Sequence, residues 1–499
     1  MKSTFRLPLV TGIALAAVVI VLSPLAMAQD ETITIDPSAA AKPFPHFWEQ
    51  MFGSGRAVLS LRESYRSDLR ATKRITDFQY VRFHGILDHE IGVYEEDPQG
   101  RPIYNFSYVD QIYDGLLAEG VKPFVEISFM PPKLAANPAP HPFWYKPLPS
   151  PPKDPQKWAA LVTAFVGHLL DRYGKDEIES WYFEVWNEPN IDFWDGVPKQ
   201  QTYFDFYDVT APAIKNVDAK LRVGGPATAQ AAWISAFIAH CLEKHIPFDF
   251  VSTHIYGNEK SEDVFGKHIE ISQRDMTARA VKKVYDEVKS SGAPNTPIIW
   301  SEYNATYMNR TDTTDSAFMG PWLANNIREC DGMQLMMSYW TFSDVFEEQG
   351  IVKTPFYGGF GLIAERNIPK AAFRAFELLH QLGNQRLDNN SENVLVTKRD
   401  GKLVLALWNY ADPGKESAAK TFHLAIKGKR GGSYIVRILD REHGSSFDKW
   451  VSMGSPKYPN TAQIQKLQQS SVLPPAARHS IRDPIELKAH ALALVEMSK

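Results

Sequence analysis

The chain has 499 residues, of which 44% are hydrophobic and 22% are charged, so it is long enough for one large globular domain and a smaller one. Its 54 Lys and Arg residues against 58 Asp and Glu residues leave a net charge of −4, which argues against a nucleic-acid partner. Two cysteines, Cys241 and Cys330, exclude a disulfide framework and a cysteine zinc site, and we expect two buried, unpaired thiols. Aromatic residues make up 12% of the chain, enough either to fill a large core or to line a site for a flat, weakly polar ligand.

The N-terminal residues have the pattern of a secretory signal peptide. Lys2 and Arg6 precede a short apolar run, and the segment ends in Ala26-Met27-Ala28. These features predict a signal peptide over residues 1–28 and export to the periplasm or the medium. An uncleaved membrane anchor is the alternative, which Pro24 and the small-residue ending disfavour. No later apolar run has membrane-spanning length, so we expect no membrane association after cleavage, although export would permit a disulfide between the two cysteines.

Between residues 43 and 384, short β-rich runs alternate with longer segments that mostly have a helical pattern. The clearest helix is expected from Trp158 to Tyr173, where Leu161, Phe165 and Leu169 recur every four residues. Eight β-rich runs are the number that a (β/α)8 TIM barrel requires. The runs are His46–Glu49, Tyr80–Phe83, Pro123–Ile127, Trp181–Val185, Leu221–Val223, Phe250–Thr253, Pro297–Trp300 and Met336–Trp340.

A proline-rich segment follows the third predicted strand. Residues 131–155 hold 10 of the 34 prolines and the cluster Phe143-Trp144-Tyr145. In a barrel, this segment lies at the C-terminal face, where active sites are built. It is expected either to shape the rim of a pocket or to form a long surface connection.

The last part of the chain, residues 385–499, has a different pattern. Strand-like runs are joined by turns, without comparable helices between most of them, which predicts an appended antiparallel β-sandwich. Glu31–Ile35 alternates like a strand, so a strand from residues 30–42 is expected to join the sandwich. The other expected strands are Asn393–Thr397, Leu403–Trp408, Thr421–Ile426, Ser433–Ile438 and His490–Val495.

Polar or aromatic residues stand at the carboxyl ends of six predicted barrel strands, which all meet at one mouth of a barrel. Carboxylates placed there raise the cost of folding unless they are paired, so their convergence indicates a functional site. The residues are His84, Glu126, Asn187, Glu188, His254, Tyr256, Glu302 and Trp340.

Two of these residues, Glu188 and Glu302, form a candidate catalytic pair. Glu188 is flanked by Trp186 and Pro189, which favours the protonated form of its carboxyl group and suits a general acid. Strands four and seven lie across the mouth from each other, so the two glutamates can flank a small substrate. One then protonates the leaving oxygen while the other attacks the anomeric carbon. Each glutamate alone has the alternative of a structural salt bridge, but the pair beside Asn187 favours catalysis.

Several segments carry a resemblance to a known family. Asn187-Glu188-Pro189 is the broadest of them, while Ser343–Glu348 and Gly358–Leu362 are much narrower signatures. From about residue 43 to 456, the chain resembles glycoside hydrolase family 39, within the retaining clan of (β/α)8 glycosidases, and lies closest to its bacterial β-xylosidases. The Asn-Glu-Pro element is shared across that clan.

The resemblance implies that Glu188 is the acid/base and Glu302 the nucleophile, with Asn187 bonded to the sugar 2-hydroxyl. Glu347 and Glu348 have the alternative of a solvated charge pair. No cofactor and no metal are expected, because the histidines lack metal-ligand spacing with carboxylates. The other positions that match residues around the sugar are His84, His254, Tyr256, Trp340, Glu347 and Glu348.

The implied activity is retaining exo-hydrolysis of β-1,4-xylosidic bonds at the non-reducing end of xylooligosaccharides. The alternatives are a β-glucoside, an arabinose-containing side chain or a uronic-acid glycoside as substrate, or a non-catalytic carbohydrate-binding protein. A uronidase needs a cation, which the matched positions do not supply. Three positions depart from the residues that are usual in the family's xylosidases. They are Ser301 and Tyr303, which flank the predicted nucleophile, and Tyr357. A homo-oligomer is also implied, since relatives often form tetramers.

Overall fold

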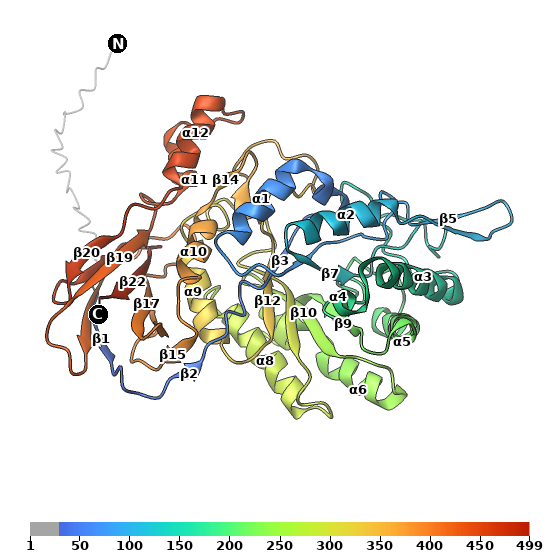
Figure 1. The fold of residues 1–499 in the computed structure, drawn as a ribbon, viewed down its shortest axis with the longest axis horizontal. Coiled ribbons are helices and arrows are strands. Elements are labelled where there is room, and N and C mark those ends of the chain that lie inside the picture. The colour runs from blue at the N-terminus through green and yellow to red at the C-terminus, as the bar shows by residue number, and fades with distance from the viewer. Residues whose placement is uncertain (1–28, 499) are drawn as a thin grey trace, which may run out of the picture.

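The computed structural model describes residues 29–498, in which a barrel and a β-sandwich lie side by side (Figure 1). The predicted signal peptide, residues 1–28, lies outside the described residues. Among residues 29–498, no helix combines the length and the apolar character that crossing a membrane requires.

Eight parallel strands form a closed barrel, which confirms the predicted (β/α)8 fold. Each strand pairs with the next along the chain, and the last pairs with the first. The strands are β3 (Met51–Gly53), β4 (Tyr80–Arg82), β7 (Lys122–Glu126), β8 (Tyr182–Glu184), β9 (Arg222–Thr228), β10 (Phe250–Tyr256), β11 (Ile298–Asn304) and β12 (Met336–Tyr339).

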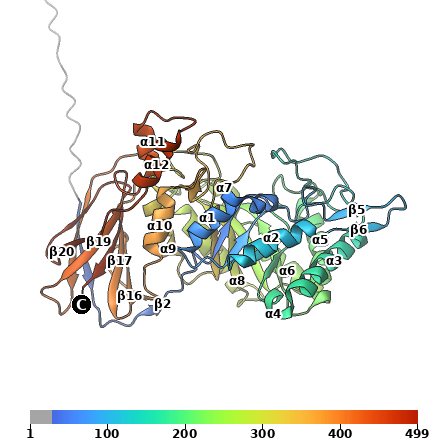
Figure 2. The ribbon, with the colours of Figure 1, turned by 45° about the horizontal axis from the view of Figure 1, so that its top comes forward.

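Helices follow the strands and surround the barrel (Figures 1 and 2). The longer ones are α1 (Glu63–Lys73), α2 (Ser107–Ala118), α3 (Pro155–Tyr173), α5 (Lys199–Val217), α6 (Ile234–Lys244), α8 (Met276–Ser290), α9 (Met319–Cys330) and α10 (Ala371–Leu379). Shorter helical segments lie in the connections, namely η1 (Ala57–Leu61), α4 (Lys175–Ile178), η2 (Ala229–Ala231) and α7 (Ser261–Phe265). A hairpin of β5 (Tyr94–Glu96) and β6 (Pro102–Tyr104) projects at the end farthest from the sandwich (Figure 1).

Helix α3 shows how local sequence sets an element. The Asp154 side chain accepts hydrogen bonds from two backbone amides of the first turn, and a proline occupies the first helical position. Gly174 ends the helix with a φ of 81°, a conformation that glycine adopts without strain. Leu161 and Phe165 are buried on the inner face. The predicted helix over residues 158–173 is therefore confirmed.

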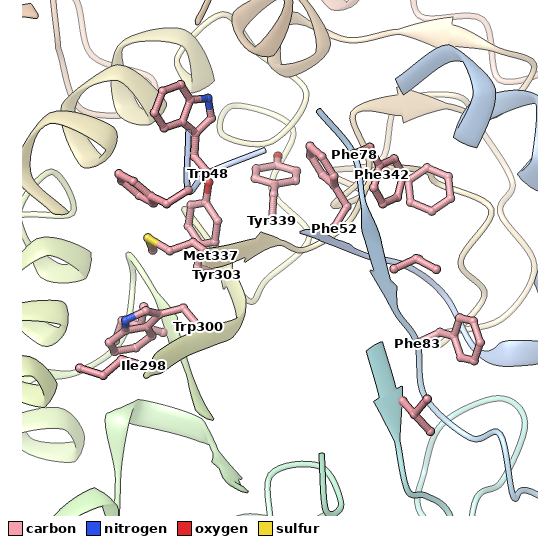
Figure 3. Close-up of a cluster of buried hydrophobic side chains, with 14 of the residues drawn as sticks. Trp48, Phe52, Phe78, Phe83, Ile298, Trp300, Tyr303, Met337, Tyr339 and Phe342 are labelled. Atoms are coloured by element: carbon pink, nitrogen blue, oxygen red, sulfur yellow. The ribbon is translucent and has the colours of Figure 1, made fainter. Parts of the chain in front are cut away.

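The first barrel strand begins later than the sequence predicted. The predicted run, His46–Glu49, lies in a turn, and β3 begins at Met51. Glu49 is fully buried, and its carboxylate lies 2.6 Å from Nδ1 of His46 and 2.9 Å from Nδ1 of His380. The apolar side chains of this turn are buried although they belong to no strand. Trp48, for example, packs in the core between the barrel and its helices (Figure 3).

The aromatic surplus of the sequence is partly core. Phe52 of β3 packs against Phe78 with ring centroids 4.8 Å apart and against Phe376 of α10 at 5.1 Å. Phe78 also contacts Phe342, at 5.5 Å (Figure 3). These rings join a barrel strand to the helices around it, so many aromatic residues stabilise the fold rather than bind a ligand.

The sandwich consists of two sheets, and one strand pair differs from the expected antiparallel arrangement. Strand β1 (Gln29–Ile35) pairs with β18 (Lys420–Ile426) in parallel, and β21 (Ile485–Leu487) completes this three-stranded sheet. The larger sheet is antiparallel. In spatial order, it contains β2 (Lys42–Pro43), β15 (Gln385–Leu387), β16 (Val394–Arg399), β17 (Lys402–Trp408), β22 (Leu492–Met497), β19 (Ser433–Leu439) and β20 (Ala477–Ser480).

Both faces of the central strands of the seven-stranded sheet, β16, β17 and β22, are buried. One face packs on the three-stranded sheet, with residues such as Leu405 and Val495 in the shared core. The other face packs on the barrel, where Val404 and Trp408 belong to the same core as α9 and α10. A Cβ on Gly320 of α9 would lie 3.2 Å from Leu439 and Leu492, which shows how closely the helix and the sheet approach.

Two helices that the sequence did not predict lie between β19 and β20. They are α11 (Ser446–Ser452) and α12 (Thr461–Ser470), and they lie near α10 in both views (Figures 1 and 2). Leu467 of α12 packs with Phe356 and Ile368, the latter in the hairpin of β13 (Ile363–Ala364) and β14 (Ile368–Pro369). The C-terminal part thereby supports the connection that follows β12.

Cys241 of α6 and Cys330 of α9 are buried and unpaired, as predicted. Burial raises the pKa of the Cys241 thiol to about 12, so the group stays protonated.

Candidate active site

The interior of the barrel changes from apolar to charged within two residues of a strand. Phe124 and Tyr182 belong to a buried apolar cluster inside the barrel. Glu126 and Glu184 stand two positions farther along the same strands, so they point to the same interior. The apolar layer closes the barrel below, and the charged layer forms the floor of a site at the C-terminal mouth.

Arg82 of β4 is fully buried and organises this layer. Its Nε donates to Glu184 at 2.6 Å, its Nη1 to Oε1 of Glu302 at 2.7 Å and its Nη2 to Oδ1 of Asn187 at 2.9 Å. The same Nη2 lies 2.8 Å from Glu126. A buried guanidinium needs such partners, and its rigid fork fixes the side chains of Asn187 and Glu302.

The candidate residues drawn from the sequence did not include Arg82. A signal was present, because Arg82 and His84 stand two positions apart in one predicted strand. Residues at this spacing face the same side of a strand, so a barrel-facing His84 implies a barrel-facing arginine.

Glu188 and Glu302 meet at the mouth, as predicted from the ends of strands four and seven. One carboxylate oxygen of each residue and one ring nitrogen of His254 all lie within 4.8 Å of one another. Glu188 and Glu302 are only 8% and 4% exposed. The Glu188 backbone has a φ of 43°, and its amide donates to the carbonyl of Ala227 at 2.8 Å, which fixes the acid to the end of β9.

The two carboxyl groups have different surroundings. Burial raises the pKa of Glu188 well above its ordinary value, and the negative charges of Glu302 and Glu259 raise it further. Burial also keeps the pKa of Glu302 above its ordinary value overall, but less strongly, because the Arg82 guanidinium and the Tyr256 hydroxyl favour the ionised form. The Tyr256 hydroxyl donates to Oε2 of Glu302 at 2.6 Å. Glu188 is therefore suited to hold a proton, and Glu302 to be ionised.

The structure places His254 against Glu188 rather than on the surface of the cavity. Its Nδ1 lies 2.9 Å from Oε1 of Glu188, and its Nε2 lies 3.1 Å from the Ser301 hydroxyl. Burial and the charges of Arg82 and His84 hold the pKa of His254 well below its ordinary value, so the ring is neutral. Because Ser301 can donate or accept, the ring can satisfy Glu188 in either protonation state.

His84 and Trp340 form one wall of the site, with ring centroids 4.8 Å apart. Nδ1 of His84 lies 2.8 Å from Glu126. Although burial lowers the pKa of His84, the Glu126 carboxylate raises it above its ordinary value overall. Trp340 lies against the end of β3 at Gly53, where a Cβ would be 2.1 Å from the indole, so only glycine permits this approach.

Glu348 and Asn187 line the cavity, and in the part of the chain that the structure describes each has one polar side-chain atom without a hydrogen bond, although Oε1 of Glu348 lies 3.7 Å from Nε2 of His84. Oε1 of Glu348 and Nδ2 of Asn187 are buried and have no hydrogen-bond partner among the described residues. Burial raises the pKa of Glu348 to about 8, in spite of the positive charge of His84 nearby. Buried polar atoms are costly without partners, so both atoms are suited to hydroxyl groups of a ligand.

The neighbouring Glu347 is placed differently. Its carboxylate forms ion pairs with Arg62 at 2.5 Å and with Arg56 at 3.3 Å. Although burial opposes it, the Arg62 side chain lowers the pKa of Glu347 below its ordinary value overall. Of the two adjacent acids that the sequence singled out, the structure places Glu348 on the cavity surface and Glu347 in an arginine cluster.

The cavity above this layer has a volume of about 740 Å³, within the usual range of small-molecule sites. His141, Pro142 and Phe143 of the proline-rich segment line it, so this segment forms part of the rim. The predicted site residues that also line it are His84, Asn187, Glu188, Tyr256, Glu302, Trp340 and Glu348.

Two groups in the described part of the chain have the donor types of a metal site. They are Glu188 with His254 and Glu302, and His46 with Glu49 and His380. In the first group, Arg82 lies 2.7 Å from Glu302, where its charge opposes a bound cation. In the second, both histidines already hydrogen-bond Glu49. Hydrogen bonding thus accounts for both groups without an ion.

Comparison with known proteins decides the family. The model of glycosyl hydrolases family 39 matches residues 31–482. The chain belongs to this family. The resemblance found in the sequence is thereby confirmed, and the protein is a glycosidase rather than a non-catalytic binding protein.

Several relatives are similar to this chain over most of their length. The β-xylosidase of Geobacillus stearothermophilus is 36% identical over 442 residues, which cover 86% of this chain and 87% of that protein. A monomeric β-xylosidase from Caulobacter crescentus has a TM-score of 0.84 and 31% identity, over 94% of this chain and 99% of that one. The family 39 enzyme from Xanthomonas axonopodis pv. citri has a TM-score of 0.85 and 30% identity, over 97% of this chain and 100% of that one.

Proposed function

We propose that this family 39 glycosidase removes xylose from the non-reducing end of β-1,4-xylooligosaccharides with retention of anomeric configuration. The observation that carries the proposal is the approach of Glu188 and Glu302, whose nearest oxygens lie within 4.8 Å. Retaining glycosidases need roughly 5 Å between their carboxyl groups, whereas inverting ones need about 6.5–9.5 Å to leave room for a water molecule.

In the first step, the ionised Glu302 attacks the anomeric carbon while Glu188 donates its proton to the glycosidic oxygen. The bond to the leaving sugar breaks, and an ester between Glu302 and the remaining sugar forms. Arg82 and Tyr256 stabilise the Glu302 carboxylate before attack and orient it by two hydrogen bonds.

In the second step, Glu188 acts as the base. Ester formation removes the negative charge of Glu302, which had raised the pKa of Glu188. The ionised Glu188 then takes a proton from water as the water displaces Glu302, and the sugar leaves with its original configuration. Throughout, His254 keeps a hydrogen bond to Glu188, because its neutral ring can donate or accept.

The choice of sugar rests on the relatives and on the charge of the cavity. The Geobacillus stearothermophilus relative is a β-xylosidase. Six acids line the cavity against two lysines, Lys199 and Lys260, and this excess of acids disfavours the carboxylate of a uronic-acid glycoside. A β-glucoside or an arabinose-containing side chain is the second candidate, since Ser301, one of the departures from the family's usual residues, hydrogen-bonds His254 beside Glu188.

Turnover of aryl glycosides tests the sugar. We expect the highest kcat/KM for aryl β-D-xyloside when it is compared with aryl β-D-glucoside, α-L-arabinoside and uronides. A higher value for another sugar contradicts the xylosidase assignment. With xylotetraose as substrate, early release of xylose and xylotriose supports exo action, whereas xylobiose as the first product contradicts it.

We further propose export and assembly as separate hypotheses. The pattern of residues 1–28 supports export, and we expect the N-terminus of the secreted protein to begin after Ala28. N-terminal sequencing of the periplasmic fraction and of the medium checks this. A homo-oligomer is expected from the family resemblance, while the Caulobacter crescentus relative is described as monomeric, and light scattering of the purified protein distinguishes the two.

A further inference from the structure

The cavity extends beyond the catalytic pair into an outer part. The deep part is lined by residues at the ends of barrel strands, such as Glu302 and Trp340, which are 4% and 3% exposed. The outer part is lined by the loops that follow β9 and β10, and its polar side chains include Gln230 and Glu259. Glu188 borders both parts, because it lies beside Glu302 and its pKa responds first to burial and then to the charges of Glu302 and Glu259.

The proposed chemistry assigns one sugar to each part. Glu302 attacks the anomeric carbon, so the sugar that is transferred lies in the deep part. The proton of Glu188 goes to the glycosidic oxygen, so the leaving sugar lies beyond Glu188, in the outer part.

Gln230 and Glu259 have unused hydrogen-bonding capacity in the outer part. Nε2 of Gln230 lies 3.4 Å from Oε2 of Glu259, which is long for a hydrogen bond. Within residues 29–498, neither side chain has another hydrogen-bond partner. Burial raises the pKa of Glu259 to about 7, so near neutral pH this carboxyl group can donate as well as accept.

The loops that carry this pair are fixed relative to the acid. The Asn190 side chain accepts from the amide of Ala229 at 2.9 Å and donates to its carbonyl at 3.1 Å, which joins the Gln230 loop to the loop of Glu188. The loop of Glu259 is joined to the loop after β11, because the amide of Tyr307 donates to the Asn258 side chain at 3.0 Å. The two polar groups are thus held in place before a ligand arrives.

We propose that Gln230 and Glu259 form the binding subsite for the leaving sugar, a neutral and hydroxyl-rich unit whose hydroxyl groups they bind. The inference rests on the proposed function, with Glu188 as the acid. It assigns a role to two residues outside the catalytic pair, namely to select an oligosaccharide over a glycoside with an apolar leaving group.

Kinetics on two substrates test the subsite. For Gln230→Ala and for Glu259→Ala, we expect kcat/KM on xylobiose to fall about 5- to 20-fold, the effect of a lost hydrogen bond. On 4-nitrophenyl β-xyloside, whose leaving group lacks sugar hydroxyls, kcat/KM should change less than about 2-fold. Each variant is measured at its own pH optimum, since Glu259→Ala also alters the pKa of Glu188. The control is Glu262→Gln, an exposed position near Glu259 that pairs with His268, for which neither substrate should be affected.

Transfer to an added sugar gives a second measurement. With 4-nitrophenyl β-xyloside as donor and methyl β-xyloside as acceptor, the wild type should form transfer product, and both variants should form less of it relative to hydrolysis. Equal losses on both substrates, or unchanged xylobiose kinetics with unchanged transfer, overturn the subsite. Absence of turnover of any β-xyloside by the wild type contradicts the proposed function instead, so the two failures are distinguishable.

Discussion

Two buried charge clusters occur beside the barrel mouth, and they are built in different ways. Around Arg82, one guanidinium faces the carboxylates of Glu126, Glu184 and Glu302. Around Lys370, one ammonium group forms ion pairs with two aspartates, Asp315 at 2.7 Å and Asp344 at 2.6 Å, and all three side chains are fully buried. Both clusters are anionic by formal charge, so charge alone does not distinguish them.

The partners of the remaining polar atoms do distinguish them. Lys370 donates to the carbonyl of Gly359, Asp315 accepts from the amide of Gly358 and Asp344 accepts from the amide of Gly361. The Lys370 cluster thus binds the main chain of one loop. That loop carries Phe360, which lines the cavity. The Lys370 cluster is bound by backbone groups and therefore positions the loop that lines one side of the cavity. The Arg82 cluster instead holds side chains that face a ligand.

Removal of the nucleophile should have the largest effect. We expect Glu302→Gly to lower kcat by roughly 10⁴- to 10⁶-fold, since the covalent step is lost. Added azide should restore turnover and give a glycosyl azide of inverted configuration, because a small anion fills the vacated position. Product identification by NMR checks this, and an azide product of retained configuration points to another nucleophile.

Removal of the acid should separate the substrates. Glu188→Gln should lose about 10²- to 10⁴-fold in kcat/KM on xylobiose, whose leaving group needs protonation, and far less on an aryl xyloside with an acidic leaving group. Steady-state kinetics on both substrates measure the difference. Losses of equal size mean that Glu188 is not the proton donor.

Lys370→Met tests the cluster that positions the wall. We expect the free energy of unfolding to fall by about 3–5 kcal/mol, because Asp315 and Asp344 stay buried without their cation. Urea unfolding measures the loss, and Lys353→Met, an exposed position in the same connection, is the control. A loss of unfolding free energy of less than about 1 kcal/mol contradicts a structural role of the Lys370 cluster and thus the difference from the Arg82 cluster.

Glu348→Gln should show the smallest effect on activity. Unlike Lys370→Met, it should raise the free energy of unfolding. We expect kcat/KM to fall about 2- to 10-fold, as for a lost hydrogen bond between neutral groups, while the protein becomes more stable. The folded state raises the pKa of Glu348 to about 8, so wild-type stability falls as pH rises from the ordinary carboxyl range through about 8.

The thermal midpoint of Glu348→Gln should therefore exceed that of the wild type by more at pH 8 than at pH 5. Glu347→Gln is the matched comparison. Although burial opposes it, Arg62 lowers the pKa of Glu347 overall, so this variant should be less stable near neutral pH, and its deficit should shrink in acid. Parallel trends for the two variants contradict the different placements of these neighbours.

The fold was largely predictable because its strongest signals are periodic. Seven barrel strands lie within or beside the predicted runs, and helix α3 followed from a four-residue repeat with clear end signals. The first strand was misplaced because Trp48 is buried against the helices, which gives the run around it the apolar pattern of a buried strand. Edge strands such as β20 were missed, since their exposed residues do not alternate.

The site was predictable where chemistry requires a residue type in a motif. Glu188 and Glu302 are brought together as their strand positions implied. Lys370 was not found, because its role depends on partners that are distant in sequence, such as Asp315. Arg82 was missed although its spacing from His84 indicated a side chain that faces the barrel interior. Glu347 and Glu348 are adjacent, so only the backbone, with a φ of 63° at Glu347, decides which of them faces the cavity.

The parallel pairing of β1 with β18 has a consequence for the order in which the protein matures. Gln29 pairs with Lys420, so the first strand of the sandwich waits for a partner that is made close to the end of synthesis. Contacts between such distant parts of a chain form slowly. The barrel strands all come before β18, so the barrel can form first and the sandwich closes last. If the predicted export occurs, the sandwich is completed only after nearly the whole chain has crossed the membrane.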